Sequence, residues 1–156
     1  MQPSDLEQYL HEHIPLSRAM QVSVVEVAAD SVTLAAPIEP NINHRGTVFG
    51  GSISAVAILA AWSLLHTRLR GEGVACRLVI QRNSIDYLKP VDGDFTARSL
   101  PPDAADWQIF TRMLARKGMA RITIRCVLKC TDATVAEFEG EFVALAGGGG
   151  DRDTDS

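Results

Sequence analysis

Residues 43–52 and 53–65 decide the fold; they read Asn-His-Arg-Gly-Thr-Val-Phe-Gly-Gly-Ser and then Ile-Ser-Ala-Val-Ala-Ile-Leu-Ala-Ala-Trp-Ser-Leu-Leu. The second stretch has no wide polar face, and a helix that is apolar nearly all round must be buried on most sides in a soluble protein. Gly71 and Gly73 predict where this helix ends. The apolar run itself is shorter than the roughly 20 residues needed to cross a bilayer. The sequence therefore predicts a buried central helix with a polar, glycine-rich entrance.

The flanking sequence predicts mostly strands. Runs rich in β-branched residues, or with alternating polarity, are bounded by turn residues. They predict a hairpin over 22–28 and 32–36, strands over 74–88 and 95–100, and a final hairpin over 119–129 and 135–145. Helical spacing predicts a surface helix over 103–117 and another that starts with a capping box of Ser4 and Glu7 and ends near His13, where Pro15 stops it. One long helix wrapped by an antiparallel sheet is an α+β arrangement.

Length and composition fit one globular domain. The chain has 156 residues, 46% of them hydrophobic, with a net charge of −4 and no run of basic residues. A core can form, and binding to nucleic acid is not expected. The three cysteines show no metal-ligand spacing, and the N-terminus has no signal peptide, so we expect reduced thiols, a cytoplasmic location and no membrane segment. We assign 1–146 to the domain and 147–156 to a disordered Gly/Asp-rich tail.

The glycine-rich entrance is the candidate site. The N-terminus of a helix presents unbonded backbone N–H groups, which attract an anion or a carbonyl oxygen that is becoming one. Glycines let an acyl group approach these N–H groups closely. Equally, Gly46, Gly50 and Gly51 could serve only a tight turn and close helix–sheet packing. The sequence contains no complete P-loop, no dinucleotide-binding glycine motif and no serine-hydrolase elbow.

At these residues the chain resembles a known superfamily. The segment Asn43–Ser52 followed by a buried helix, together with Asp86-Tyr87-Leu88-Lys89-Pro90-Val91 at the end of the long strand, is similar to the hot-dog-fold thioesterases. The nearest resemblance is to a thioesterase family that also occurs as the C-terminal domain of some bacterial acetyltransferase fusions. The order of predicted elements matches from about Leu6 to Leu145.

The resemblance implies a hot-dog fold and hydrolysis of acyl thioesters carried by coenzyme A or acyl-carrier protein. It also implies a homodimer or a dimer of dimers, with sheets joined edge to edge and active sites at the interface. Asn43 stands where many related thioesterases keep an Asn, and Gly50 stands where a backbone N–H polarises the thioester carbonyl. Gly51 shares that turn. No cofactor and no metal are expected.

The sequence departs from the superfamily at two positions. Phe49 replaces a His found in many relatives before the glycine pair, and Ile58 stands where many carry a catalytic Asp or Glu. No acidic residue occurs from Asn41 to Gly71. The usual carboxylate mechanism therefore cannot be carried over to this chain.

Several residues could take part in its place. His44 could activate water, although a loop histidine bonded to backbone is the simpler interpretation. Asn43 could orient a water or form an Asx turn, and Ser52 could hold a water or, more simply, cap the helix. Asn83 and Asp86, on the long strand, could approach substrate from a partner subunit, and Arg82 could meet the phosphates of coenzyme A or be a solvated surface charge. The remaining predicted substrate-binding residues are in the entrance loop: Gly46, Thr47, Val48 and Phe49.

Three functions remain open from the sequence. The first is an acyl-thioester hydrolase. The second is a non-catalytic module that binds or senses acyl thioesters, suggested by the missing helix carboxylate. The third is a hydratase or dehydratase, which usually needs a His together with a carboxylate.

Overall fold

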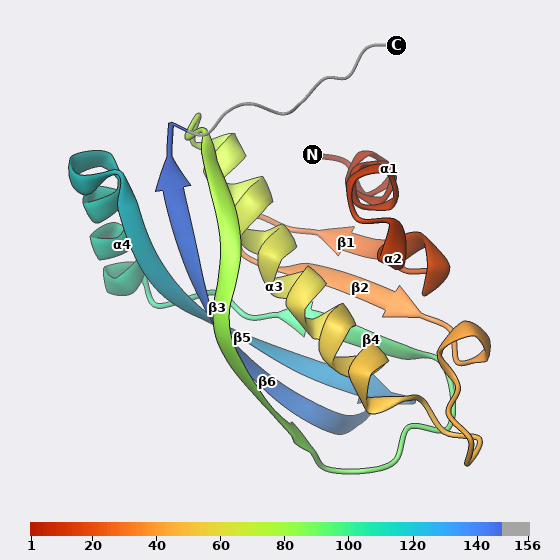
Figure 1. The fold of residues 1–156 in the computed structure, drawn as a ribbon. Helices are drawn as coiled ribbons and strands as arrows, with labels where there is room; N and C mark the ends of the chain where they lie inside the picture. Colours follow the sequence, from red (N-terminus) through yellow and green to blue (C-terminus); the bar gives the residue numbers. More distant parts are fainter. Residues whose placement is uncertain (148–156) are drawn as a thin grey trace.

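In the computed structural model, which describes residues 1–147, a six-stranded sheet curls around one long helix (Figure 1). All strand pairs are antiparallel, in the order β1-β2-β4-β5-β6-β3. The strands are β1 (Ser23–Val27), β2 (Val32–Ala36), β3 (Cys76–Tyr87), β4 (Phe95–Ser99), β5 (Met119–Cys130) and β6 (Ala133–Ala146). The helices are α1 (Pro3–His13), α2 (Pro15–Ala19), α3 (Gly50–Gly71) and α4 (Ala104–Lys117), with a 3-10 turn η1 (Glu39–Asn41).

The predicted α+β arrangement is confirmed, and the core lies between α3 and the concave face of the sheet. The side of α3 that faces the sheet is fully buried, with Val56, Ala60 and Leu64 all at 0% exposure. By length and composition α3 would be able to cross a membrane, since it has 22 residues and a mean hydropathy of 1.3 in its most apolar window. Of that window, 56% is buried within the protein, as expected for a core helix. Burial, rather than the shortness of the apolar run, identifies α3 as a core element.

The two predicted hairpins are confirmed. The second closes between Cys130 and Ala133, which pair across a two-residue turn. Thr131 and Asp132 have φ values of 49° and 63°, as a type I′ turn requires at both central positions. Cys126 and Cys130 are both buried on one face of β5, as their even spacing predicts, and burial raises the pKa of the Cys126 thiol.

The predicted start of α1 is wrong. The helix begins at Pro3, which suits a first helical position because proline has no N–H to leave unbonded, and no side chain caps it. Glu7 does not fold back as a capping box; its Oε1 accepts a hydrogen bond from the Val24 N–H of β1 at 2.9 Å. The predicted end at His13 is confirmed, but Pro15 then starts the short helix α2, which the sequence pattern did not indicate.

Strand β3 lies at one edge of the sheet and runs alongside α3 (Figure 1). Its pairing with β6 shifts between Ile80 and Arg82, so Gln81 is an extra, bulged residue. The bulge places Gln81 and Asn83 on different faces, because Asn83 pairs with Gly140 on the same face as the pair of Ile80 with Phe142. The proposed tail, 147–156, lies outside the described residues apart from Gly147.

Candidate functional site

Asn43 organises the loop that precedes α3. Its Oδ1 accepts hydrogen bonds from the backbone N–H groups of Arg45 at 2.9 Å and Thr47 at 3.2 Å. Its Nδ2 donates to Thr47 Oγ1 at 2.8 Å, and its own N–H donates to the Thr47 carbonyl at 2.8 Å. The structure therefore gives Asn43 the Asx-turn role, with both ends of its amide used inside the loop.

The loop is also fixed to its neighbours. The Val48 N–H donates to the Val91 carbonyl, and the Phe49 N–H donates to the Asn41 carbonyl, both at 2.8 Å. The buried Asn41 in turn donates from Nδ2 to the Met20 carbonyl at 2.9 Å. The sequence did not indicate this role, because Met20 is 21 positions away along the chain. The loop thus enters α3 in one defined direction.

The first turn of α3 leaves two backbone donors unused. Phe49 occupies the N-cap position without a capping side chain, and its carbonyl accepts the N–H groups of Ser52 and Ile53. The N–H groups of Gly50 and Gly51 have no hydrogen-bond acceptor within residues 1–147. Ser52 lies in the first turn rather than at the cap, so its predicted capping role is wrong. Two adjacent N–H groups at a positive helix end can stabilise a developing oxyanion.

Two aromatic rings flank these glycines. Tyr87, at the end of β3, donates its hydroxyl to the Gly50 carbonyl at 2.9 Å, and a Cβ added to Gly50 would lie 3.4 Å from that hydroxyl oxygen. A Cβ added to Gly51 would overlap the Phe49 ring, which is 59% exposed. A side chain at position 50 would thus make ordinary contact with Tyr87, whereas one at position 51 would require the Phe49 ring to move. Tyr87 was seen in the sequence only as part of the strand-end motif.

A half-buried apolar stripe begins next to Gly51. Helical spacing places Ala55, Ile58 and Trp62 along one side of α3, and Trp62 Nε1 donates to the Leu78 carbonyl of β3 at 3.4 Å. All three are partly buried hydrophobic residues that pack against the core. Farther along, Trp62 stacks on His66 with ring centroids 4.6 Å apart. The stripe offers an apolar surface that starts at the unused N–H groups.

Other predicted site residues lie farther from these donors. His44 is exposed at the tip of the loop, and its side chain has no hydrogen-bond partner within residues 1–147. Arg82 and Asn83 are exposed and precede Tyr87 on β3 by five and four residues, which corresponds to roughly 13 Å or more along a strand. Within one chain, neither reaches the first turn of α3.

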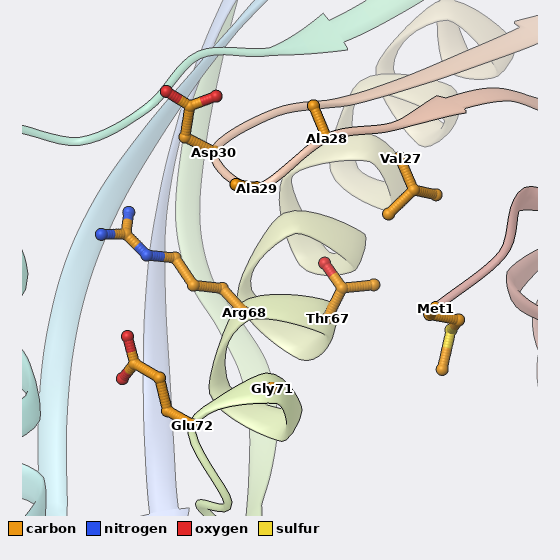
Figure 2. Close-up of a pocket in the computed structure, with 9 residues that line it drawn as sticks. All are labelled: Met1, Val27, Ala28, Ala29, Asp30, Thr67, Arg68, Gly71 and Glu72. Carbon is orange, nitrogen blue, oxygen red and sulfur yellow. The ribbon is translucent and has the colours of Figure 1, made fainter.

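A hollow of about 620 Å³ lies at the other end of α3 (Figure 2). Figure 2 shows Asp30, Arg68 and Glu72 on one side and Met1 across from them. Arg68 stacks its guanidinium over the Trp107 ring at 3.9 Å, and Trp107 Nε1 donates to Glu72 Oε1 at 3.1 Å. Arg68 and Glu72 thus both contact Trp107. Gly50 is almost the full length of α3 away, about 30 Å, so this hollow is separate from the candidate site.

Comparison with known proteins places this architecture among the hot-dog-fold thioesterases. Residues 3–146 match the model of a family described as "Putative thioesterase (yiiD_Cterm)". The chain belongs to this family.

Solved structures agree with that assignment. A protein of unknown function from Chlorobaculum tepidum has 29% identity and a TM-score of 0.85, over 92% of this chain and 94% of that one. A putative thioesterase from Shewanella oneidensis has 26% identity and a TM-score of 0.81, over 92% and 96%. A thioesterase from Haemophilus influenzae, at 12% identity and a TM-score of 0.75 over 94% and 92%, is similar in fold alone.

Proposed function

We propose that the protein hydrolyses acyl thioesters of coenzyme A or acyl-carrier protein at the first turn of α3. The observation that carries the proposal is the pair of unbonded N–H groups of Gly50 and Gly51 at the head of a helix bordered by an apolar stripe. The thioester carbonyl accepts from these N–H groups while the acyl chain lies along Ala55, Ile58 and Trp62. Family membership supports thioesterase chemistry in general.

In this mechanism water adds to the thioester carbonyl carbon, and the two N–H groups stabilise the oxyanion that forms. Collapse of the tetrahedral intermediate breaks the C–S bond, and the sulfur leaves as a thiol after taking a proton. A single preorganised oxyanion donor contributes on the order of 100-fold to 1,000-fold in kcat. No carboxylate occurs from Asn41 to Gly71, so any acid or base must come from elsewhere in the chain or from a second subunit.

The proposal includes a cytoplasmic homodimer, in which β3 provides the contact between subunits. β3 is an edge strand of 12 residues, and long uncovered edges readily pair with another chain. Arg82 and Asn83, which do not reach Gly50 in their own chain, would then be candidates to approach the partner's substrate.

Release of thiol from acyl-CoAs of short, long and aromatic chains tests this function, with a thiol-reactive dye as readout. A reaction without substrate corrects for the protein's own cysteines, including the half-buried Cys76. Turnover above the uncatalysed rate is expected, and it should fall in Gly50→Pro, which removes one N–H at a helix position that tolerates proline. Absence of turnover with every acyl-CoA and with acyl-carrier-protein substrates would contradict the proposal.

A binding or sensing module is the second candidate, favoured by the absence of acidic residues in 41–71. It predicts saturable acyl-CoA binding by calorimetry with no hydrolysis above background. The same titration separates the two functions, because a hydrolase consumes its ligand during the experiment and a binding module does not.

Asn43→Ala should lower turnover and stability together, because the side chain makes three short hydrogen bonds inside the loop. Loss of such bonds costs about 1–2 kcal/mol in the free energy of unfolding, measured by urea titration. Asn43→Asp keeps the Oδ1 acceptor and should retain more of both. Lost turnover at unchanged stability would instead show that Asn43 acts on water or substrate.

A further inference from the structure

Tyr87 makes a contact for which neither the fold nor the loop has an evident need. Its ring is 50% exposed, so the side chain does not fill the core. Its hydroxyl nevertheless reaches across 37 sequence positions to donate to the Gly50 carbonyl at 2.9 Å. In the helix that begins at Gly50, that carbonyl is also the i→i+4 acceptor for the Ser54 N–H, one step after the bond from Ile53 to Phe49. Tyr87 therefore adds a second donor to a carbonyl that the helix already uses.

The bonded carbonyl belongs to the same planar peptide group as the Gly51 N–H. In a trans peptide the C=O and the N–H point in opposite directions, so a hydrogen bond that fixes the carbonyl also fixes the direction of the N–H. A donor at the carbonyl further polarises the peptide and strengthens its N–H as a donor. The Gly51 N–H has no acceptor within residues 1–147, so both effects act on a group available to a ligand.

We propose that Tyr87 is a positioning residue that aims and strengthens the Gly51 N–H for the carbonyl oxygen of an acyl thioester. The inference rests on the proposed function, and it adds a residue from the end of β3 to a site otherwise built from the entrance loop and α3. An added Cβ at Gly50 would lie at an ordinary contact distance, 3.4 Å, from the hydroxyl oxygen, so the Tyr87 hydroxyl lies close to this part of the backbone.

Tyr87→Phe isolates this role because it keeps the ring and removes only the hydroxyl. Loss of one hydrogen bond of ordinary strength corresponds to about a threefold to tenfold fall in kcat. Because the oxyanion forms only in the transition state, KM should change little. Tyr9→Phe is the matched control: Tyr9 is on α1, away from the glycine pair, and the variant keeps the ring that stacks on His13, Trp62 and His66, so it should keep wild-type kcat.

The Gly51 amide proton, observed by NMR, gives a readout that does not depend on hydrolysis. In Tyr87→Phe without ligand its resonance should move upfield, whereas in Tyr9→Phe it should not move. A 2-oxoalkyl-CoA, in which a methylene separates sulfur from carbonyl and blocks hydrolysis, should shift this resonance less in Tyr87→Phe than in wild type.

These measurements separate the inference from the proposed function. An unchanged Gly51 resonance in Tyr87→Phe would overturn the inference, as would a moved resonance with unchanged kcat. If wild type hydrolyses no thioester, the proposed function fails. The analogue titration then decides the role of Tyr87: a smaller Gly51 shift in Tyr87→Phe supports it, and equal shifts in the two proteins overturn it.

Discussion

Gly46 shows how one residue supports the approach to α3. It has φ of +79°, a conformation that costs an L-residue with a side chain about 1–2 kcal/mol. No atom would contact an added Cβ, so the cost of a substitution comes from the backbone alone. In this turn the Gly46 N–H donates a hydrogen bond to the Asn43 carbonyl at 3.3 Å. Strain at Gly46 would therefore be transmitted to the loop that Asn43 organises.

Gly46→Ala should lower the free energy of unfolding by about 1 kcal/mol and reduce turnover, since the loop sets the direction of entry into α3. Gly71→Ala is the control, because Gly71 lies at the end of α3 with open space around it and no positive φ. Urea titrations measure the free energy of unfolding of both variants, and they are comparable when the slopes against urea concentration agree. Equal stability of the two variants would mean that the loop tolerates another backbone conformation at Gly46.

At the residue scale, the sequence showed which segment matters but not how it is bonded. Glycine and asparagine at 43–51 predicted a turn leading to exposed N–H groups, because their backbone preferences are local. The bond from Tyr87 to Gly50 was not predictable, since it depends on the register and bulge of β3 against β6. Glu7 illustrates the same limit: its local capping pattern was outcompeted by an N–H of β1.

At the scale of elements, α3 has two different long sides. Periodicity predicted a helix buried nearly all round, and the sheet does bury most of it. The stripe of Ala55, Ile58 and Trp62 is only partly buried, which an apolar pattern cannot distinguish from full burial. Exposed apolar surface of this kind marks a ligand or partner surface. Ile58, where relatives carry a carboxylate, thus places a hydrocarbon side chain beside the glycine pair.

Ile58→Trp should shorten the preferred acyl chain if the stripe binds that chain. Each buried methylene contributes about 0.8 kcal/mol, so exclusion of two methylenes lowers kcat/KM for long-chain substrates about tenfold, with little change for acetyl-CoA. Thiol release across a chain-length series measures the shift. Ile109→Trp, on the exposed side of α4, is the control and should leave the series unchanged. An equal loss at every chain length would place the acyl chain elsewhere.

At the scale of the whole molecule, the two sheet edges are unequal. The edge strand β1 has only five residues, and its Val24 N–H donates to the Glu7 carboxylate. The other edge strand, β3, has twelve residues. Proteins commonly shorten, charge or cover an edge to prevent pairing with other chains. β3 instead exposes Val79 at 51%, on a strand long enough to extend the sheet into a second subunit. A two-fold axis would bring β3 of both chains together, so that residue i of one chain contacts residue j of the other and the reverse.

Light scattering should therefore give a mass of twice the 16.9 kDa chain, with Val79→Glu shifting the protein towards the monomer. The glutamates of two symmetric strands would repel each other and would lose water on pairing. Val25→Glu is the matched control, since Val25 is a similarly exposed valine, at 56%, on the opposite edge strand β1. A wild-type monomer, or dissociation caused by Val25→Glu alone, would exclude β3 as the contact. If Arg82 and Asn83 act on the partner's substrate, Val79→Glu should also lose turnover in proportion to the monomer formed, because each site then needs both chains.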